Sequence, residues 1–245
     1  MTVARAALVT GGSSGIGLAL ASVLAAEGHD VTIAARDPGR LEEARARIQR
    51  GTARDIHAVA ADVTEPESIR ALVESHVDRF GRLDVLCLSA GYGRPTDLEA
   101  IRPDDVGRML AVNVAAPLDV LRESMPWLRK AADEHGRALV VLVASIAGAT
   151  PTPGFAVYSA TKAAVRSLAR SLNDDLAESG IRACALCPGF VDTPMTGWVT
   201  DDDVRASMID PADLGEVARL LLRLGPNSVV DEVVIRRPGS RYGEP

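Results

Sequence analysis

Two side chains in this 245-residue sequence could move a proton together: Tyr158 and Lys162, in the segment Tyr-Ser-Ala-Thr-Lys. They are four positions apart in a helical pattern that continues to about Glu178, so we expect both to project from one face of a helix. A free phenol has a pKa near ~10, and a fixed cation nearby favours the phenolate and lowers that pKa. We therefore predict that Tyr158 donates or accepts a proton at neutral pH with the help of Lys162.

Two polar residues upstream could complete such a site. Ser145 follows the apolar segment Arg137–Ala144, and a hydroxyl at the carboxyl end of a buried strand could hydrogen-bond a carbonyl or alcohol oxygen. Asn113 lies within a helical segment, where Asn is unfavourable unless its side chain has a specific partner. The alternative for Asn113 is a hydrogen bond to the backbone of its own helix.

A glycine-rich turn lies between the first predicted strand and the first predicted helix. The segment is Thr-Gly-Gly-Ser-Ser-Gly-Ile-Gly, residues 10–17. Gly11 permits a sharp turn, Gly15 lets the backbone approach a pyrophosphate, and Gly17 allows the helix to pack closely on the sheet. The N–H groups and the positive dipole end of the helix would then bind phosphates. The alternative is a tight turn with a structural role alone.

Taken together, the Gly-rich turn, Ser145 and the Tyr158–Lys162 pair resemble the motifs of the classical short-chain dehydrogenases/reductases, and matches run from Thr10 to Thr193. The resemblance implies reversible hydride transfer between a nicotinamide cofactor and a carbonyl or secondary alcohol. In that scheme Tyr158 donates the proton, Lys162 also binds the nicotinamide ribose, Ser145 orients the carbonyl, and Asn113 holds a water of a proton relay. The alternative is a non-redox nucleotide-binding scaffold or regulatory protein on the same fold.

The resemblance also implies a set of cofactor-binding residues along the chain. Besides Tyr158 and Lys162, these are Gly11, Ser13, Ser14, Gly15, Ile16, Gly17, Arg36, Asp62, Val63, Ala90, Gly91, Pro188, Gly189, Val191 and Thr193. Asp62 matches a residue that hydrogen-bonds adenine; its alternative is a helix cap or a loop carboxylate. The segment Leu88–Gly91 departs from the family's Asn-Asn-Ala-Gly, and the missing amides would weaken the ties between neighbouring loops.

The end of the second predicted strand favours NADP(H) over NAD(H). An acidic residue there binds the ribose 2′-hydroxyl in Rossmann folds, whereas an Arg accommodates a 2′-phosphate. Here the strand ends in Ala35, and Arg36 follows. Asp37 is expected to face solvent or to cap the next helix. Ser13 stands where NADP-preferring relatives often carry a basic residue, and Arg36 could alternatively be an ordinary surface charge.

The elements that must position these residues alternate along the whole chain. Strands are expected at Ala6–Thr10, Asp30–Ala35, Ile56–Ala60, Asp84–Ser89, Arg137–Ala144, Ile181–Leu186 and Val229–Ile235. Helical patterns begin near Gly15, Gly39, Pro66, Pro103, Gly154 and Pro211. This alternation predicts a doubly wound parallel α/β sheet of about seven strands, Rossmann-like, in a single domain over residues 1–237. We expect a loop at Ala132–Gly136 and a flexible tail at 238–245, which could alternatively pack over a neighbouring subunit.

Composition excludes several other classes of protein. The formal net charge is −6 and the basic residues are scattered, so we expect no binding of nucleic acid or of an anionic membrane. The longest apolar stretch, Ala138–Ala149, is too short to span a bilayer, and residues 1–8 lack the features of a signal peptide, which predicts a cytoplasmic protein. Cys184 and Cys187 are three positions apart on a strand and should face opposite sides, so we expect no shared metal.

The candidate substrate pocket is apolar and lacks an obvious Arg for a carboxylate, which favours a small apolar ketone or alcohol. Its predicted residues are Tyr92, Ile146, Ala147, Pro151, Phe155, Phe190, Met195 and Trp198. The segment Thr196–Met208 could be a mobile lid, or an ordinary connection whose acidic residues begin a helix. The resemblance further implies a homodimer or homotetramer, with the helices near Pro103–Lys130 and Gly154–Glu178 at the subunit interfaces.

Overall fold

A seven-stranded parallel sheet forms the centre of the computed structural model, which describes residues 4–150 and 152–240. In chain order the strands are β1 Ala6–Thr10, β2 Asp30–Ala35, β3 Ile56–Ala60, β4 Val85–Leu88, β5 Ala138–Val143, β6 Ile181–Pro188 and β7 Glu232–Ile235. Their order in the sheet is β3-β2-β1-β4-β5-β6-β7, so the winding direction reverses between β1 and β4. The predicted Rossmann-like fold is confirmed, and ligands of such sheets bind at the carboxyl ends of the strands beside this reversal.

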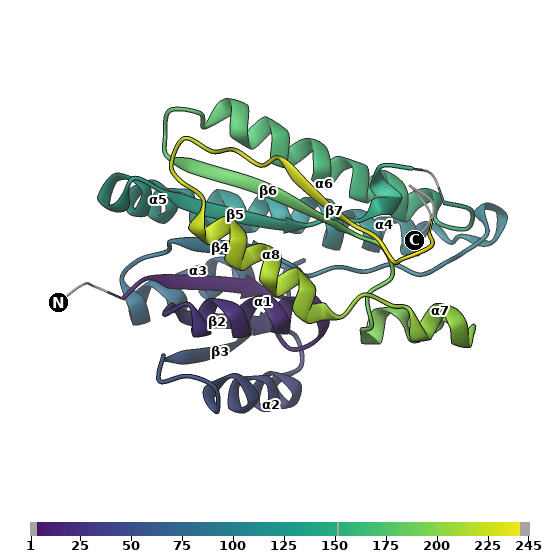
Figure 1. Cartoon of the computed structure of the whole chain (residues 1–245), viewed down its shortest axis with the longest axis horizontal. Coiled ribbons are helices and arrows are strands. Elements are labelled where there is room, and N and C mark those ends of the chain that lie inside the picture. Colours follow the sequence, from purple (N-terminus) through teal and green to yellow (C-terminus); the bar gives the residue numbers. More distant parts are fainter. Residues whose placement is uncertain (1–3, 151, 241–245) are drawn as a thin grey trace.

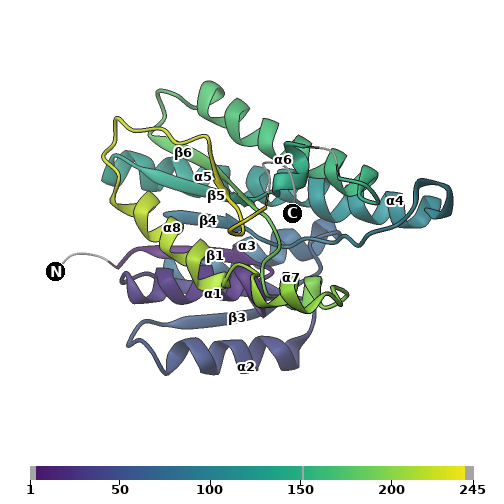
Figure 2. The ribbon, with the colours of Figure 1, turned by 45° about the vertical axis from the view of Figure 1, so that its right-hand side comes forward.

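Helices cover both faces of the sheet (Figures 1 and 2). One buried cluster joins the sheet to α1 Gly15–Ala26, α2 Pro38–Gln49 and α8 Pro211–Arg223. The opposite cluster joins it to α3 Pro66–Phe80, α5 Ala116–His135 and α6 Ala156–Asp175. In β5, Leu139 and Val141 belong to the first cluster, whereas Val140 and Leu142 belong to the second. Successive residues of a strand therefore meet a core on either side, which explains why the strands are continuously apolar.

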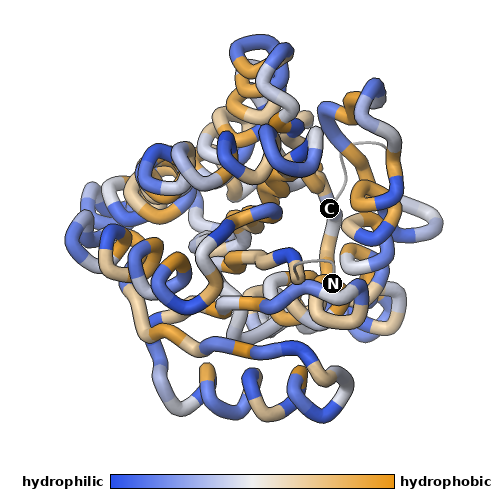
Figure 3. Tube along the Cα trace, turned by 90° about the vertical axis from the view of Figure 1, so that its left-hand side faces the viewer, coloured by the Kyte–Doolittle hydropathy of each residue, from blue (hydrophilic) through white to orange (hydrophobic). Residues whose placement is uncertain are grey.

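Shorter elements connect the main ones on the side where the strands end. They are η1 Leu98–Ala100, α4 Pro103–Leu110, the π-helix η2 Ala111–Ala115, η3 Ile146–Gly148, η4 Pro194–Thr196 and α7 Asp202–Ala206. Figure 3 shows hydrophobic segments gathered between sheet and helices and hydrophilic segments outside. None of the helices in the described ranges is long and apolar enough to cross a membrane.

The predicted loop at Ala132–Gly136 is wrong. The helix α5 continues to His135, because Ala131 and Ala132 are buried against the core and the polar residues after them occupy its exposed last turn. Gly136, with φ 71°, then ends the helix in the left-handed conformation. In the segment Thr196–Met208, by contrast, the acidic residues do begin a helix: the Asp201 side chain accepts a hydrogen bond from the Val204 N–H (2.9 Å) and caps α7.

Two further predictions concern single positions. Cys184 lies in the α1-side core cluster and Cys187 in the α6-side cluster, so the two thiols face opposite sides of β6 as predicted. In the predicted tail, the Ser240 carbonyl accepts a hydrogen bond from Arg236 (2.8 Å). The end of the tail, 241–245, lies outside the described residues.

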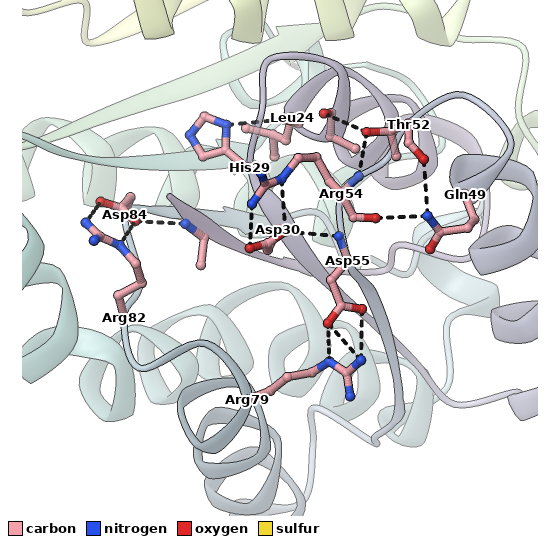
Figure 4. Close-up of polar contacts among 12 residues, drawn as sticks. Leu24, His29, Asp30, Gln49, Thr52, Arg54, Asp55, Arg79, Arg82 and Asp84 are labelled. Atoms are coloured by element: carbon pink, nitrogen blue, oxygen red, sulfur yellow. Dashed lines mark hydrogen bonds and ion pairs between the residues drawn. The ribbon is translucent and has the colours of Figure 1, made fainter. Parts of the chain in front are cut away.

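Paired charges cover the amino edge of the sheet, where β1 to β4 begin (Figure 4). Arg82 donates two hydrogen bonds of 2.7 Å to Asp84, which also accepts one from the Ala6 N–H (2.8 Å). Arg54 binds Asp30 through two further hydrogen bonds, of 3.0 and 2.7 Å. Burial alone would raise the pKa of the Asp84 carboxyl, but the hydrogen bonds from Arg82 and Ala6 hold it below its ordinary value. These carboxylates fasten the strand starts to one another.

Candidate active site

A cavity of about 330 Å³ opens at the carboxyl ends of the strands, the side of the sheet where α7 lies in Figure 1. All of the predicted cofactor residues line it, as do Ser145, Tyr158 and Lys162. Residues from Gly11 to Thr193 are thus brought together around one space. Asn113 is the exception, since it is buried beneath the cavity lining rather than part of it.

The glycine-rich turn leaves no room for side chains. A Cβ at Gly17 would lie 2.2 Å from the Gly11 carbonyl oxygen, and one at Gly15 would lie 2.8 Å from the Thr193 side chain. Gly15 also has a φ of 51°, which favours glycine. Ser14, the N-cap of α1, makes no side-chain hydrogen bond to the helix, and the first turn holds no acidic residue. The first N–H groups of α1 are therefore left to an anion such as a pyrophosphate.

Tyr158 and Lys162 lie in the first turns of α6. The Lys162 ammonium is 4% exposed, donates a hydrogen bond to the Val143 carbonyl (2.8 Å), and lies 5.6 Å from the centroid of the Tyr158 ring. No carboxylate within the described ranges forms an ion pair with it. Burial lowers the pKa of Lys162 to about 8 because the surrounding protein disfavours the charged form.

The pKa of Tyr158 differs from the prediction. Burial raises it to about 12, although an interaction with the Ser145 hydroxyl acts in the opposite direction. The predicted lowering by Lys162 was wrong for this state of the site, because the desolvation of the phenolate outweighs it and the ammonium is bound to the Val143 carbonyl. Burial therefore favours the protonated form of the phenol.

Ser145 is fixed by the turn that it caps. Its hydroxyl accepts a hydrogen bond from the Ala147 N–H (3.2 Å) at the start of η3 and donates one to the Pro188 carbonyl (3.4 Å). A Cβ at Gly148 would lie 2.5 Å from the Lys162 carbonyl carbon, so η3 packs directly on α6. This contact places the hydroxyl at the carboxyl end of β5 beside the phenol.

Asn113 ties two parts of the site together. Its amide donates to the Tyr92 carbonyl (2.7 Å) and to the Thr161 hydroxyl (3.0 Å), and its oxygen accepts from the Tyr92 N–H (2.8 Å). The alternative, bonding within its own helix, is therefore not the arrangement found. The residue lies in the π-helix η2, a local widening of the helix that often marks functional sites.

The loop after β4 has replacements for its missing Asn amides. The Thr10 hydroxyl accepts hydrogen bonds from the N–H groups of Ser89 (3.2 Å) and Ala90 (3.3 Å). Asn113 holds the next turn through Tyr92. The backbone of this loop is thus fixed from β1 and from η2.

The predicted adenosine end gathers the charged lining residues. Arg36 is exposed at the rim and forms no hydrogen bond or ion pair with the described part of the chain. Asp62 accepts hydrogen bonds from the Thr64 N–H (2.9 Å) and hydroxyl (2.7 Å), which lower its pKa, so it is a loop carboxylate that also lines the cavity. Asp37 caps α2, which is one of the two roles predicted for it.

Several lining residues were missed from the sequence, among them Arg108, Thr152 and Gly93. Arg108 lies on α4 with its guanidinium 4.2 Å from the Tyr92 ring centroid, and Thr152 follows η3. At Gly93 a Cβ would lie 2.2 Å from the Tyr158 ring, so glycine is needed for the phenol to fit. The sequence offers one signal for Arg108: it precedes the lining residue Val112 by four positions, so the two lie on the same face of the helix.

The predicted substrate pocket is largely assembled. Ala147 and five larger side chains line the cavity as expected: Tyr92, Phe155, Phe190, Met195 and Trp198. Ile146 was wrongly included, because it is fully buried in η3 and points into the protein interior. Pro151 lies outside the described residues.

Comparisons with known proteins agree with this arrangement. A family model described as short chain dehydrogenase matches residues 5–203. An uncharacterized oxidoreductase of Staphylococcus saprophyticus is 36% identical over 235 residues, covering 95% of this chain and 97% of the relative. A relative from Staphylococcus epidermidis, also described as an uncharacterized oxidoreductase, is 34% identical and covers 95% of this chain and 96% of its own.

Solved structures are similar over nearly the whole chain. An alcohol dehydrogenase from Thermococcus sibiricus complexed with 5-hydroxy-NADP has a TM-score of 0.87 and 27% identity, covering 97% of this chain and 98% of that one. A 3-ketoacyl-(acyl-carrier-protein) reductase from Brucella melitensis complexed with NADH has a TM-score of 0.86 and 28% identity, covering 95% and 96%.

Proposed function

This chain belongs to the short-chain dehydrogenase/reductase family of NAD(P)-dependent oxidoreductases, and on that premise we propose that it transfers a hydride reversibly between NADP(H) and a carbonyl or secondary alcohol. The observation that carries the proposal is the convergence of Ser145, Tyr158 and Lys162 on the cavity that the Gly-rich turn also lines. The polypeptide thereby combines a phosphate cradle with a proton donor in one space.

The residues present fit a nicotinamide dinucleotide. Its pyrophosphate would bind the N–H groups at the start of α1, where the Gly17 position has no space for a side chain. Lys162 would hold the nicotinamide ribose, and the backbone near Val191 with Thr193 would hold the carboxamide. When bound, the cofactor supplies or accepts the hydride.

The preference for NADP(H) rests on Ala35 and Arg36. No carboxylate ends β2, and the unpaired guanidinium of Arg36 is available to a 2′-phosphate. Similar structures contain either cofactor type, so the neighbours leave the choice open. Arg36→Ala should weaken NADPH binding about 10- to 150-fold, as expected for a charge-assisted hydrogen bond, and NADH binding less than about 2-fold. Arg40→Ala, at the exposed start of α2, serves as the control in fluorescence titrations, and equal losses for both cofactors would remove the assignment.

The protein side chains handle the proton. In reduction, the Ser145 hydroxyl donates a hydrogen bond to the substrate oxygen, and the Tyr158 phenol transfers its proton to that oxygen. Asn113 would hold a water that returns the proton by way of Lys162. The Thr161 hydroxyl, which accepts from the Asn113 amide and donates to the Tyr158 backbone carbonyl, keeps the Asn113 side chain in position. Lys162 stabilises the phenolate left behind.

A screen of NADPH oxidation with neutral ketones tests the reaction itself. We expect turnover with at least one ketone small enough to fit in the cavity beside the bound cofactor. The non-redox scaffold alternative predicts tight nucleotide binding without any turnover, and that result across the whole screen would overturn the proposed reaction.

We also propose self-association into a homodimer or homotetramer through the faces around α4 to α6. Leu110 and Leu118 are 48% and 46% exposed there, and Ala160, Ala163 and Ala164 form an exposed strip of small residues on α6. Light scattering would give a monomer mass if this proposal were wrong.

A further inference from the structure

The aromatic residues of this chain are concentrated in one place. The whole sequence contains only three Phe, three Tyr and two Trp. Five of these side chains line the cavity: Tyr92, Phe155, Tyr158, Phe190 and Trp198. A chain that builds its core almost entirely from Ala, Val, Leu and Ile thus places its aromatic rings where a ligand would lie.

Four of the rings form a connected surface, which we call the aromatic wall: Tyr158, Phe155, Trp198 and Phe190. The Phe155 centroid lies 5.9 Å from that of Tyr158 and 5.8 Å from that of Trp198. Trp198 in turn lies 5.6 Å from Phe190, with their planes at 85°. All three separations are ones that aromatic pairs prefer; the first and last pairs are edge-to-face, whereas Phe155 and Trp198 are tilted at 47°, and the rings hold one another in place. The wall begins at the proton donor.

Part of the wall is uncovered. Trp198 is 40% exposed and the adjoining Met195 is 42% exposed, which places them among the exposed large hydrophobic residues of the chain. An apolar ligand that covered these surfaces would remove them from water.

One charged lining residue lies at the wall itself, because the Lys162 ammonium is 5.6 Å from the Tyr158 ring centroid. The others are Arg36, Asp62 and Arg108, and both arginines act electrostatically on Asp62 at the adenosine end. Lys162 is bound to the Val143 carbonyl beneath the phenol. Arg237 contacts the wall through the Phe190 ring, 5.8 Å from its centroid, and donates to the Ser207 hydroxyl (3.0 Å), but it is not a lining residue. The two cations beside the wall, Lys162 and Arg237, thus already donate to the Val143 carbonyl and to the Ser207 hydroxyl. The face of Trp198 between them is apolar.

We propose that the substrate is an uncharged ketone, or the matching secondary alcohol, with an aromatic ring close to the carbonyl. The ring packs on Trp198 between Phe155 and Phe190, while the oxygen reaches the hydroxyls of Ser145 and Tyr158. This inference rests on the proposed hydride transfer for the placement of the oxygen. The position of the substrate's aromatic ring is inferred from the aromatic wall alone.

The binding test uses the holoprotein with saturating NADP⁺, in which a ketone binds without turnover. Acetophenone is compared by calorimetry with cyclohexyl methyl ketone, which has the same number of carbons but no π face. Aromatic contacts add enough beyond area burial to predict a Kd about 2- to 12-fold lower for acetophenone. We expect 4-acetylbenzoate, which carries a carboxylate, to bind at least about 10-fold more weakly than acetophenone. Equal affinity for the three ketones would overturn the proposal.

Two variants locate the ring. Trp198→Leu keeps an apolar side chain but removes the indole face, and should reduce the preference for acetophenone to less than about 2-fold. Trp127→Phe, in α5, is the matched control and should keep the full preference. Since the chain has two Trp, Trp127→Phe also leaves Trp198 as the sole indole, whose fluorescence should change on binding of acetophenone. An unchanged preference in Trp198→Leu would place the ring elsewhere and contradict the proposal.

The two proposals fail in different ways. If acetophenone binds with the expected preference but no ketone supports NADPH oxidation, the hydride transfer fails and the aromatic site stands. If cyclohexyl methyl ketone is reduced with a kcat/KM equal to or above that of acetophenone, the hydride transfer stands and the aromatic preference fails.

Discussion

The two edges of the sheet use polar side chains in opposite ways. At the amino edge, Arg82 and Asp84 are both nearly buried, yet each charge has a partner at 2.7 Å. At the carboxyl edge, Lys162 is equally buried, but within the described ranges its ammonium contacts the Val143 carbonyl and the Tyr158 ring and forms no ion pair with a carboxylate. Buried charges are thus ion-paired at the amino edge, where they only connect strands. At the carboxyl edge, where a ligand is expected, a buried cation has no ion-pair partner among the described residues. Burial of charge is costly without a partner, so an unpaired buried cation is a sign of function.

The largest effect should come from Lys162→Met. We expect turnover to fall about 10²- to 10⁴-fold because the phenolate of Tyr158 loses its cation. The free energy of unfolding should stay level or rise by about 1 kcal/mol, since the variant removes a buried charge that has no ion-pair partner. The chain's other lysine, Lys130, provides the control Lys130→Met. A large loss of stability with retained turnover would show that Lys162 is a structural residue.

Arg82→Met should have the opposite effects: a large loss of stability and little change in turnover. It leaves the Asp84 carboxylate buried without its guanidinium, which is expected to cost about 3–5 kcal/mol of unfolding free energy. Arg70→Met breaks an exposed pair with Glu67 and should cost less than about 1 kcal/mol. The turnover of the folded fraction should change less than about 2-fold in both. Urea unfolding measures the two stabilities, and steady-state assays measure the turnover. Equal unfolding free energies for the two variants would contradict the prediction.

A smaller effect is expected from His76, which is fully buried between β2 and the start of β4. Its ring accepts from or donates to the Thr32 hydroxyl (2.7 Å) and the Arg82 carbonyl (2.9 Å), and burial lowers its pKa to about 4. The unfolded chain binds a proton at this His near pH ~6.5. Between these values the unfolded state binds more protons, so stability should fall by about 3 kcal/mol as the pH falls from ~6.5 to ~4.

The control for this pH dependence is His76→Gln, which removes the titrating group. Burial also lowers the pKa values of His29 and His57, so part of the slope should remain. Thermal unfolding across this interval checks the prediction, and an unchanged slope in His76→Gln would contradict it.

Local patterns were enough to predict most of the fold and to name most of the residues that line the cavity. Continuous apolar strands, prolines at helix starts and the turn at Gly11–Gly17 depend on neighbouring residues, and the structure has them where expected. The end of α5 was missed because the burial of Ala131 and Ala132 depends on tertiary packing. Arg108 was missed for the same reason, since its position over Tyr92 requires the placement of α4.

The electrostatics were the least predictable feature. The direction of the Tyr158 pKa depends on how much protein surrounds the phenol, which the spacing to Lys162 does not reveal. The pairing of Asp30 with Arg54 likewise requires the register of β2 and β3. Spacing therefore predicted which groups react, whereas the direction of their pKa shifts required the three-dimensional structure.

The central claim is that Tyr158 is the proton donor of an NADP(H)-dependent reaction. Tyr158→Phe removes the hydroxyl alone and keeps the ring that packs against Gly93 and Phe155. We expect an NADPH Kd within about 2-fold of the wild type together with a loss of ketone reduction of about 10²-fold or more, measured on the same preparation. Near-normal reduction by the variant would contradict it.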